Sequence, residues 1–90
     1  MATVRFTSAL KRFFPDLHDE EFSGTTVKDT LRSIEKKYPG MLSYLVDDNG
    51  ELRKHVNIYV GGDLIEDRKN FEDKVQEKDE VIIFQALSGG

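Results

Sequence analysis

The chain has 90 residues, of which 38% are hydrophobic and 33% charged, and a formal net charge of -4. This length suffices for one hydrophobic core and excludes two, and the composition is that of a folded globular domain. The acidic balance disfavours nucleic acid as a partner, and the absence of cysteine excludes disulfides, a thiolate nucleophile and cysteine-based metal sites.

The sequence also lacks the signals of a membrane or secreted protein. Its apolar runs are far shorter than the roughly 20 residues that a transmembrane helix needs. The N-terminus goes directly into alternating residues, without the basic and apolar regions of a signal peptide. We therefore expect a cytoplasmic location and no membrane partner.

The first residues alternate in polarity. Residues 3–7 have the two-residue period of a half-buried strand, and β-branched and aromatic side chains favour the same structure. Leu10, Phe13 and Phe14 predict one or two helical turns with an apolar face, which Pro15 ends. Residues 18–23 are expected to return as a second strand.

Residues 26–38 give the strongest helical signal. Thr25 or Thr26 is the expected N-cap, and Pro39-Gly40 is the expected end. Apolar residues recur in this segment at spacings of four, three and four, which places them on one helix face: Val27, Leu31, Ile34 and Tyr38. A helix of this kind should pack across a sheet.

The middle of the chain holds a hairpin signal. Residues 41–46 predict a single helical turn, followed by a loop at 47–50 that is dense in turn residues. Residues 56–60 alternate as a strand. Gly61-Gly62 then predicts a turn, beyond which residues 64–65 are expected to pair briefly.

The last third contains one further strand. Residues 66–80 are mostly charged and predict a loop. Residues 80–86 have an unbroken apolar centre, which indicates a central strand with contacts on both faces. One face can pack on the helix at 26–38, and the other must meet further core, solvent or a partner.

The order strand, strand, helix, strand, short strand, strand predicts an α+β fold, with one main helix packed across a mixed sheet of four or five strands. This is the β-grasp, or ubiquitin-like, arrangement. Its first and last strands lie side by side in parallel, so the chain leaves the sheet at one edge. We expect a β-grasp domain over residues 1–86 and a flexible tail over residues 87–90.

Candidates for catalysis are few. His18 and His55 are the only histidines, and neither stands in a known catalytic spacing. A solvated histidine at a strand start is the favoured interpretation of His55. His18 belongs to an acidic segment that could suggest a metal site but lacks further ligands, so a solvated loop is favoured there: Asp16, Asp19, Glu20 and Glu21. We expect no catalytic residue and no bound metal.

Two other patterns also favour ordinary structural explanations. Gly61-Gly62 lacks the glycine spacing and the following helix of a phosphate-binding loop. Lys28, Arg32 and Lys36 form a positive stripe that could bind an anion or an acidic partner, although such a row is most often a solvated helix face.

The terminal Gly89-Gly90 carries the clearest functional signal. Two glycines without side chains adopt extended conformations freely and can thread a channel too narrow for other residues. The α-carboxylate of Gly90 is charged at neutral pH, with a reference pKa of about 3.3 to 3.7, and is inert until activated. Adenylation with ATP would make it a mixed anhydride that sulfide, a persulfide or an amine could attack. The alternative is an ordinary frayed terminus.

Over essentially its whole length the chain resembles the ubiquitin-like sulfur-carrier family, the MoaD/ThiS group. The most specific feature is the terminal glycine pair. The resemblance rests on four features in all: Val27 to Tyr38 followed by Pro39, the turn Asp48-Asn49-Gly50-Glu51-Leu52, the strand Val56 to Val60, and Asp79-Glu80-Val81 leading through Phe84 to Gly89-Gly90.

Within that family two subfamilies remain open. Residues 52–60 look most like the carriers that serve cysteine synthesis, whereas the turn and tail fit molybdopterin synthase small subunits about as well. Molybdopterin carriers commonly have prolines where this chain has Gln85 to Ser88.

The resemblance implies a carrier protein rather than an enzyme. An E1-like adenylating and sulfurtransferase enzyme would use ATP to adenylate Gly90, and a sulfur donor would convert the acyl-adenylate to a thiocarboxylate. The sulfur would pass to an acceptor such as a cysteine synthase or a molybdopterin synthase large subunit. No cofactor is expected to stay bound, since the activating enzyme uses the ATP.

The resemblance also assigns residues around the tail. Leu87, Ser88 and Gly89 would thread into the partner, and Phe84 aligns with the aromatic position of the family near the tail. Phe84 is expected either at a partner interface or in the core. The same activated tail fits an alternative function, a ubiquitin-like modifier joined through Gly90 to lysines of other proteins.

Overall fold

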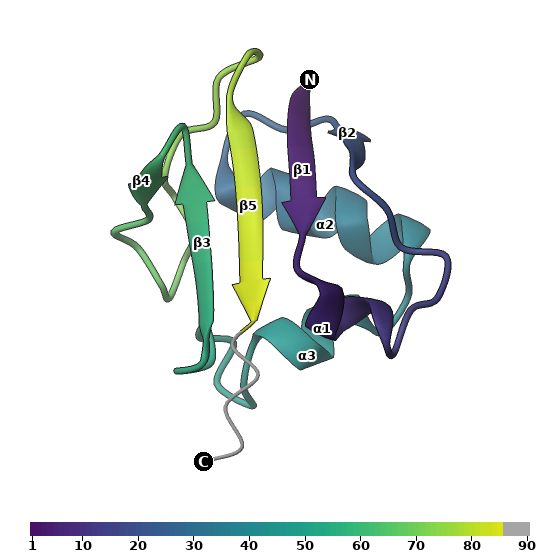
Figure 1. Cartoon of the computed structure of the whole chain (residues 1–90). Coiled ribbons are helices and arrows are strands. Elements are labelled where there is room, and N and C mark those ends of the chain that lie inside the picture. The colour runs from purple at the N-terminus through teal and green to yellow at the C-terminus, as the bar shows by residue number, and fades with distance from the viewer. Residues whose placement is uncertain (86–90) are drawn as a thin grey trace.

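The computed structural model describes residues 1–85. The observed elements follow the predicted order, with ends that differ from the predicted ones by no more than a few residues (Figure 1). They are β1 (Ala2–Phe6), α1 (Ser8–Lys11), β2 (Glu20–Phe22), α2 (Val27–Lys37), α3 (Met41–Leu45), β3 (Val56–Val60), β4 (Asp63–Leu64) and β5 (Glu80–Gln85).

The strands of this part of the chain form one five-stranded sheet in the order β2-β1-β5-β3-β4. β1 and β5 pair in parallel, with Val4 opposite Val81, and the other neighbours are antiparallel. This topology confirms the predicted β-grasp fold, with the last strand at the centre. The predicted boundary at residue 86 and the tail at 87–90 lie outside the described residues.

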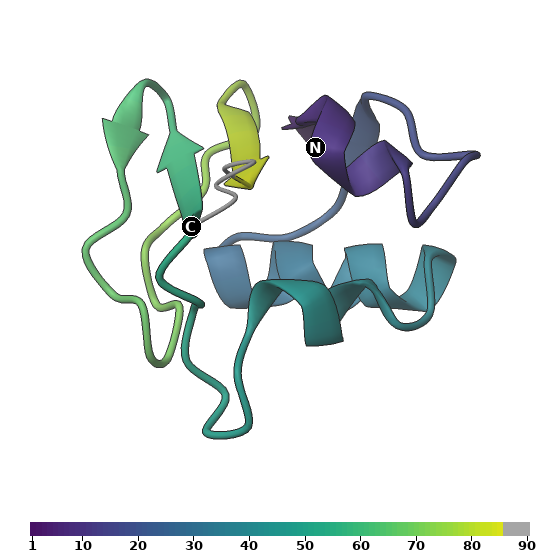
Figure 2. The same cartoon turned by 60° about the horizontal axis from the view of Figure 1, so that its bottom comes forward.

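The main helix, α2, forms one layer against one face of the sheet, as the two views show (Figures 1 and 2). Thr26 is its N-cap, and the Thr26 hydroxyl accepts a hydrogen bond of 3.2 Å from the backbone N–H of Asp29. Its apolar face is buried as predicted, with Val27, Leu31 and Ile34 at most 4% exposed. None of the helices in residues 1–85 is long and apolar enough to span a membrane.

The segment between β4 and β5 has no helix or strand of its own, as predicted, but it also completes the core. Phe71 and Val75 are buried at 7% and 5% exposure. The carbonyls of Phe71 and Asp73 accept hydrogen bonds of 2.9 Å from the backbone N–H groups of Lys28 and Val27. The segment therefore satisfies amides of the first turn of α2, which have no partner within the helix.

The short helix α1 corrects one expectation. It forms a single turn in which Leu10 is fully buried. Of the two phenylalanines that follow the turn, Phe14 packs against the core, but Phe13 is 54% exposed. Phe13 does not join the apolar face, because it stacks instead on Tyr44 of α3, with ring centroids 4.7 Å apart.

Candidate functional site

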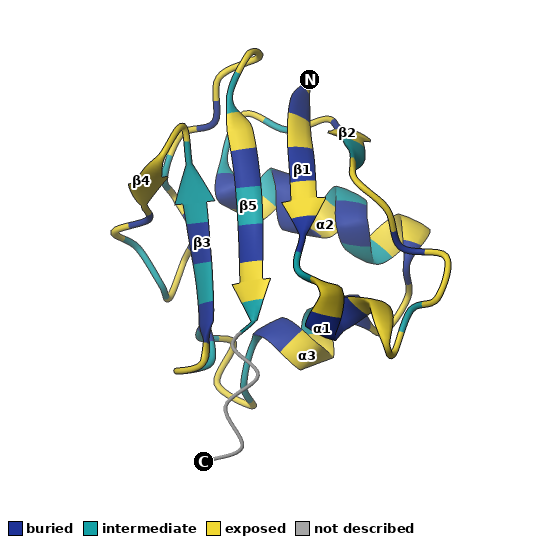
Figure 3. Cartoon of the chain, viewed as in Figure 1, coloured by how far each residue is buried: buried dark blue, intermediate teal, exposed yellow. Residues whose placement is uncertain are grey.

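The central strand β5 divides its side chains between two environments. Val81 and Ile83 point into the core and are at most 1% exposed, whereas Phe84 is 43% exposed and Ile82 is half-buried. Figure 3 shows this alternation as bands along β5. Phe84 is therefore not a core residue. The other expectation, that Phe84 lies at a partner interface, stays a prediction.

The neighbouring strands extend this exposed side into an apolar surface. Tyr59 lies opposite Ile82 on β3, and Leu64 lies opposite Tyr59 on β4. Leu64 is 50% exposed and Tyr59 is half-buried. We call these four residues the open-face strip: Tyr59, Leu64, Ile82 and Phe84. Side chains alternate between the faces of a strand, so the open-face strip lies on the face opposite to the one that carries Val81 and Ile83 into the core.

The end of β5 is fixed by contacts from distant parts of the chain. The backbone N–H of Gln85 donates a hydrogen bond of 3.1 Å to Thr7 Oγ1, and Gln85 Nε2 lies 3.3 Å from His55 Nε2. We call Thr7, His55 and Gln85 the tail root, because the chain continues from it to residue 86. The sequence analysis favoured a solvated side chain for His55, and His55 is exposed in the structure. The sequence did not indicate that His55 lies beside Gln85.

A hollow of about 290 Å³ adjoins the tail root. Tyr44 and Arg53 contribute to its lining, and the Arg53 guanidinium donates a hydrogen bond of 3.1 Å to the Ser43 carbonyl. The helices α1 and α3 lie at the end of the molecule where β5 ends (Figure 1). Sequence reasoning missed this hollow, because its residues come from segments that periodicity does not relate.

The acidic segment around His18 is occupied by structural contacts. His18 Nε2 lies 3.1 Å from Glu20 Oε2, and Glu20 also binds Lys37 and accepts a hydrogen bond of 2.8 Å from the Tyr38 hydroxyl. Asp19 accepts a hydrogen bond from the backbone N–H of Phe6. The solvated-loop expectation was thus incomplete, since these carboxylates attach the loop to β1 and α2. Across residues 1–85, no group of three or more His, Asp or Glu side chains is arranged to hold a metal ion.

Three groups away from the tail root have shifted pKa values. Burial raises the pKa of Glu20, but the bonds from Lys37 and Tyr38 outweigh it, so the pKa lies below the usual 4.5. Burial and the bond to Glu20 raise the pKa of Tyr38 to about 12. Hydrogen bonds from backbone amides, first that of Asn70, lower the pKa of Asp67. These shifts report structural hydrogen bonds rather than a catalytic pair.

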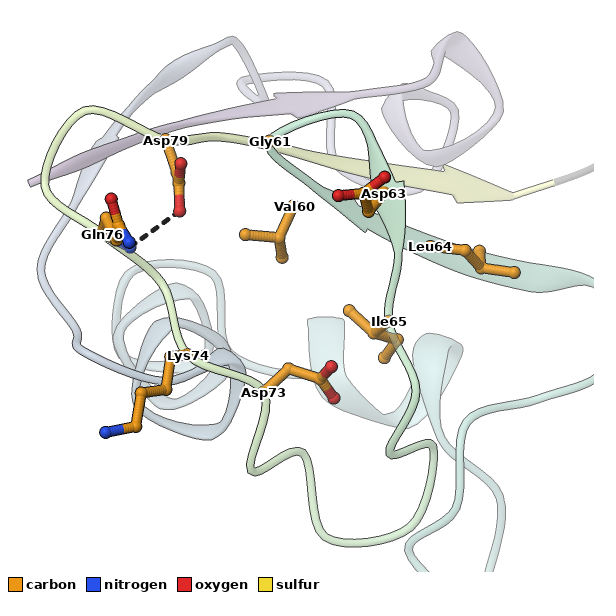
Figure 4. A pocket seen from close by; sticks show the side chains of 9 residues that line it. All are labelled: Val60, Gly61, Asp63, Leu64, Ile65, Asp73, Lys74, Gln76 and Asp79. Carbon is orange, nitrogen blue, oxygen red and sulfur yellow. Dashed lines mark hydrogen bonds between the residues drawn. The ribbon is translucent and has the colours of Figure 1, made fainter.

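A second hollow, of about 260 Å³, lies near Gly61 at the opposite end of β5 (Figure 4). Two of its three carboxylates already accept backbone hydrogen bonds: Asp79 from Gln76 at 2.8 Å, and Asp73 from Glu66 and Asp67 at 3.0 and 2.8 Å. Gly61 and Gly62 have φ of 58° and 91°, which confirms the hairpin turn. This hollow is formed around the hairpin turn, and none of its lining residues belongs to the tail root.

One predicted site residue, Phe84, lies within the described residues. It belongs to the open-face strip and directly precedes Gln85 of the tail root. The other predicted site residues lie outside the described residues: Leu87, Ser88, Gly89 and Gly90. The described part of the candidate site is therefore the open-face strip and the tail root.

Known proteins resemble this chain over nearly its whole length. The family model described as the ThiS family matches residues 4–90. Small archaeal modifier protein 3 of Haloferax volcanii is 34% identical over 89 residues, which cover 99% of this chain and 91% of that protein.

Solved structures are similar in fold. Mycobacterium tuberculosis CysO has a TM-score of 0.83 and 25% identity, with 97% of this chain and 100% of that chain covered. A chain of the Amycolatopsis orientalis BexX/CysO complex has a TM-score of 0.84 and 24% identity, with both chains fully covered. These likenesses agree with the β-grasp topology.

Proposed function

Because the chain belongs to the ThiS family, we propose that it is a sulfur carrier whose C-terminal Gly90 is adenylated and converted to a thiocarboxylate. The observation that carries the proposal is that the family match continues to residue 90 and so includes the terminal glycine pair. The absence of cysteine supports it, since sulfur could then be carried only on the terminal carboxylate.

The proposed chemistry has two steps. A carboxylate oxygen of Gly90 attacks the α-phosphate of ATP on a partner enzyme, which forms the acyl-adenylate and releases pyrophosphate. Hydrosulfide then attacks the acyl carbon and displaces AMP, which leaves the thiocarboxylate. The carrier contributes a reactive end without side chains, and the partner contributes the catalytic groups.

The open-face strip and the tail root are the surfaces that we assign to the E1-like activating enzyme. An exposed aromatic side chain beside half-buried apolar ones is the kind of surface that supplies binding energy at protein interfaces. Phe84 connects the two regions, because it belongs to the open-face strip and directly precedes Gln85 of the tail root. The acceptor would be a cysteine synthase or a molybdopterin synthase large subunit, which must bind the same tail in turn.

One observation favours a second function, that of a protein modifier. The 34% identical relative from Haloferax volcanii is named a small archaeal modifier protein. Both functions would begin with the same adenylate. They differ in the nucleophile, since a lysine amine would attack the acyl carbon in place of hydrosulfide and form an isopeptide bond.

The test uses the intact protein with its activating enzyme, ATP and sulfide. The C-terminal peptide should gain the mass of one sulfur in exchange for one oxygen, and a thiol alkylating agent should label that peptide alone. Deletion of Gly90 should abolish both results without changing the melting temperature. Lys78→Ala is the control, because Lys78 is an exposed residue just before β5, at the opposite end of that strand from the tail, and this variant should still be activated.

Two outcomes would count against the carrier. Adenylation of the Gly90 deletion at the normal rate would show that the terminal glycine is not the site. Absence of thiocarboxylate together with isopeptide-linked conjugates in the source cells would assign the chain to the modifiers.

A further inference from the structure

A small apolar pocket lies in the helical layer, away from the open-face strip. It has a volume of about 190 Å³. Its floor is made by apolar side chains of α2, of α3, and of the segments that follow α3 and β4: Leu31, Leu42, Val46 and Phe71. Lys28 and Arg32 line it from successive turns of α2. We call it the helix-layer pocket.

The floor of this pocket is held by backbone contacts. Phe71 has φ of 56°, and it is the only residue other than glycine with positive φ among residues 1–85. This conformation costs about 1–2 kcal/mol for a residue with a Cβ. The Phe71 carbonyl is fixed by the N–H of Lys28 at 2.9 Å, and Asp67 accepts from the N–H groups of Lys69 and Asn70 at 3.1 and 2.9 Å. The pocket is thus formed before any partner arrives, which lowers the entropic cost of binding.

The charges around this pocket are of one sign. Lys28 and Arg32 are exposed, and within the described part of the chain neither forms an ion pair. Its lining there contains no carboxylate. The pocket is therefore locally positive although the whole chain carries a net charge of -4. Such a site attracts an anionic ligand and repels a cationic one.

We propose that the helix-layer pocket is a second docking site, which binds an acidic segment of a partner protein through one large apolar side chain. The volume suits a single side chain rather than a helix. The apolar floor favours leucine, isoleucine, methionine or phenylalanine at the centre of the segment, and the two cations favour aspartate or glutamate on either side.

This site is separate from the open-face strip and the tail root, which we assign to the enzyme that activates Gly90. None of its lining residues belongs to a strand, whereas the open-face strip belongs to β3, β4 and β5. A partner bound at the pocket would leave the open face and the tail root uncovered. Tethering of this kind raises the effective concentration of the tail at an enzyme associated with that partner.

The experiment uses a fluorescein-labelled synthetic peptide with a single leucine at its centre and two aspartates on each side. We expect saturable binding by fluorescence anisotropy and shifts of backbone NMR signals at residues 28–32, 42–46 and 71. Lys28→Glu with Arg32→Glu should weaken binding about tenfold or more. Lys36→Glu is the matched control for Arg32→Glu alone, because each reverses one charge and Lys36 lies one turn further along α2, outside the lining. Arg32→Glu alone should weaken binding clearly, whereas Lys36→Glu should change affinity by no more than about twofold.

Four results would overturn the proposal. NMR shifts on the open-face strip would place the peptide on the wrong face, and equal weakening by Lys36→Glu would reduce the effect to general charge. Equal binding of a peptide with alanine in place of the central leucine would show that the apolar floor has no role. Self-association of the protein that Arg32→Glu abolishes would identify a second copy as the occupant.

Discussion

The two faces of the sheet differ although consecutive residues of one strand supply both. On the covered face, Ile83 and Val81 are at most 1% exposed beneath α2. On the open face, Phe84 is 43% exposed. The covered face accounts for the fold, because burial of apolar area is the main favourable term in folding. The open face carries apolar area that the fold leaves exposed, and such area is typical of a surface that meets other proteins.

The largest expected effect falls on the covered face. Ile83 is fully buried between Phe6 on β1 and Ile58 on β3. Ile83→Ala should lower the free energy of unfolding by about 2–5 kcal/mol, because it removes buried methyl groups and leaves a cavity. Urea denaturation measures this change. A loss below about 1 kcal/mol would mean that the covered face does not carry the core as the burial indicates.

A smaller loss is expected at Arg68, which joins the segment after β4 to the edge of the open face. Its guanidinium donates to the carbonyls of Arg53 and Val56 at 2.7 and 2.9 Å, and to Asn57 Oδ1 at 3.2 Å. Arg68→Met should cost about 1–3 kcal/mol of stability, because these partly buried acceptors lose their donor. Arg68→Lys keeps the charge but not the planar fork, so denaturation should show only partial recovery. Full recovery by lysine would assign the effect to charge alone.

Phe84→Ala should separate binding from stability. Since Phe84 is exposed, we expect a stability loss of about 1 kcal/mol or less. Binding to the activating enzyme should weaken about tenfold or more, as measured by calorimetry. Leu64→Ala changes the far edge of the same strip and should have a smaller effect. A large drop in melting temperature with unchanged binding would show that the two faces do not differ in the way their exposure implies.

The smallest effect concerns Tyr38, which caps the C-terminal end of α2 and donates a hydrogen bond to Glu20. Its pKa is raised to about 12 from the usual 10.0, by burial first and then by the bond to Glu20. A raised pKa in the folded state contributes stability that is present below pH 10 and is lost as the pH rises toward 12. The free energy of unfolding should therefore fall in this window more steeply in the natural protein than in Tyr38→Phe. Equal slopes would show that folding does not raise the pKa of Tyr38.

The sequence was sufficient for the parts of the fold that have a clear period. The apolar spacing of α2 and the alternation of β3 predicted both elements, and the order of elements predicted the parallel pairing of β1 with β5. The burial of Phe71 was not predictable, because it stands in a charged segment and its position depends on hydrogen bonds to the first turn of α2. Local patterns do not report contacts of that kind.

The candidate site was predictable only in part, for a related reason. The glycine pair and Phe84 could be singled out from chemistry and position in the sequence. The tail root could not, because it joins Gln85 to His55 and Thr7, which are 30 and 78 residues away. Only the register of three strands brings these residues together. The unbroken apolar run in β5 left open whether the second face of this strand meets further core, solvent or a partner, and within the described residues Phe84 on that face is 43% exposed.

The contact between Gln85 and Thr7 also constrains how this molecule reaches its native state. Parallel pairing of segments so far apart requires closure of a loop that contains nearly the whole domain, and pairings of this kind form slowly. During synthesis, β1 and β3 must wait for β5, because β5 lies between them in the sheet. A ribosome-bound chain that ends before residue 80 would therefore leave both strands with unpaired edges, which makes such chains prone to aggregation and to capture by chaperones.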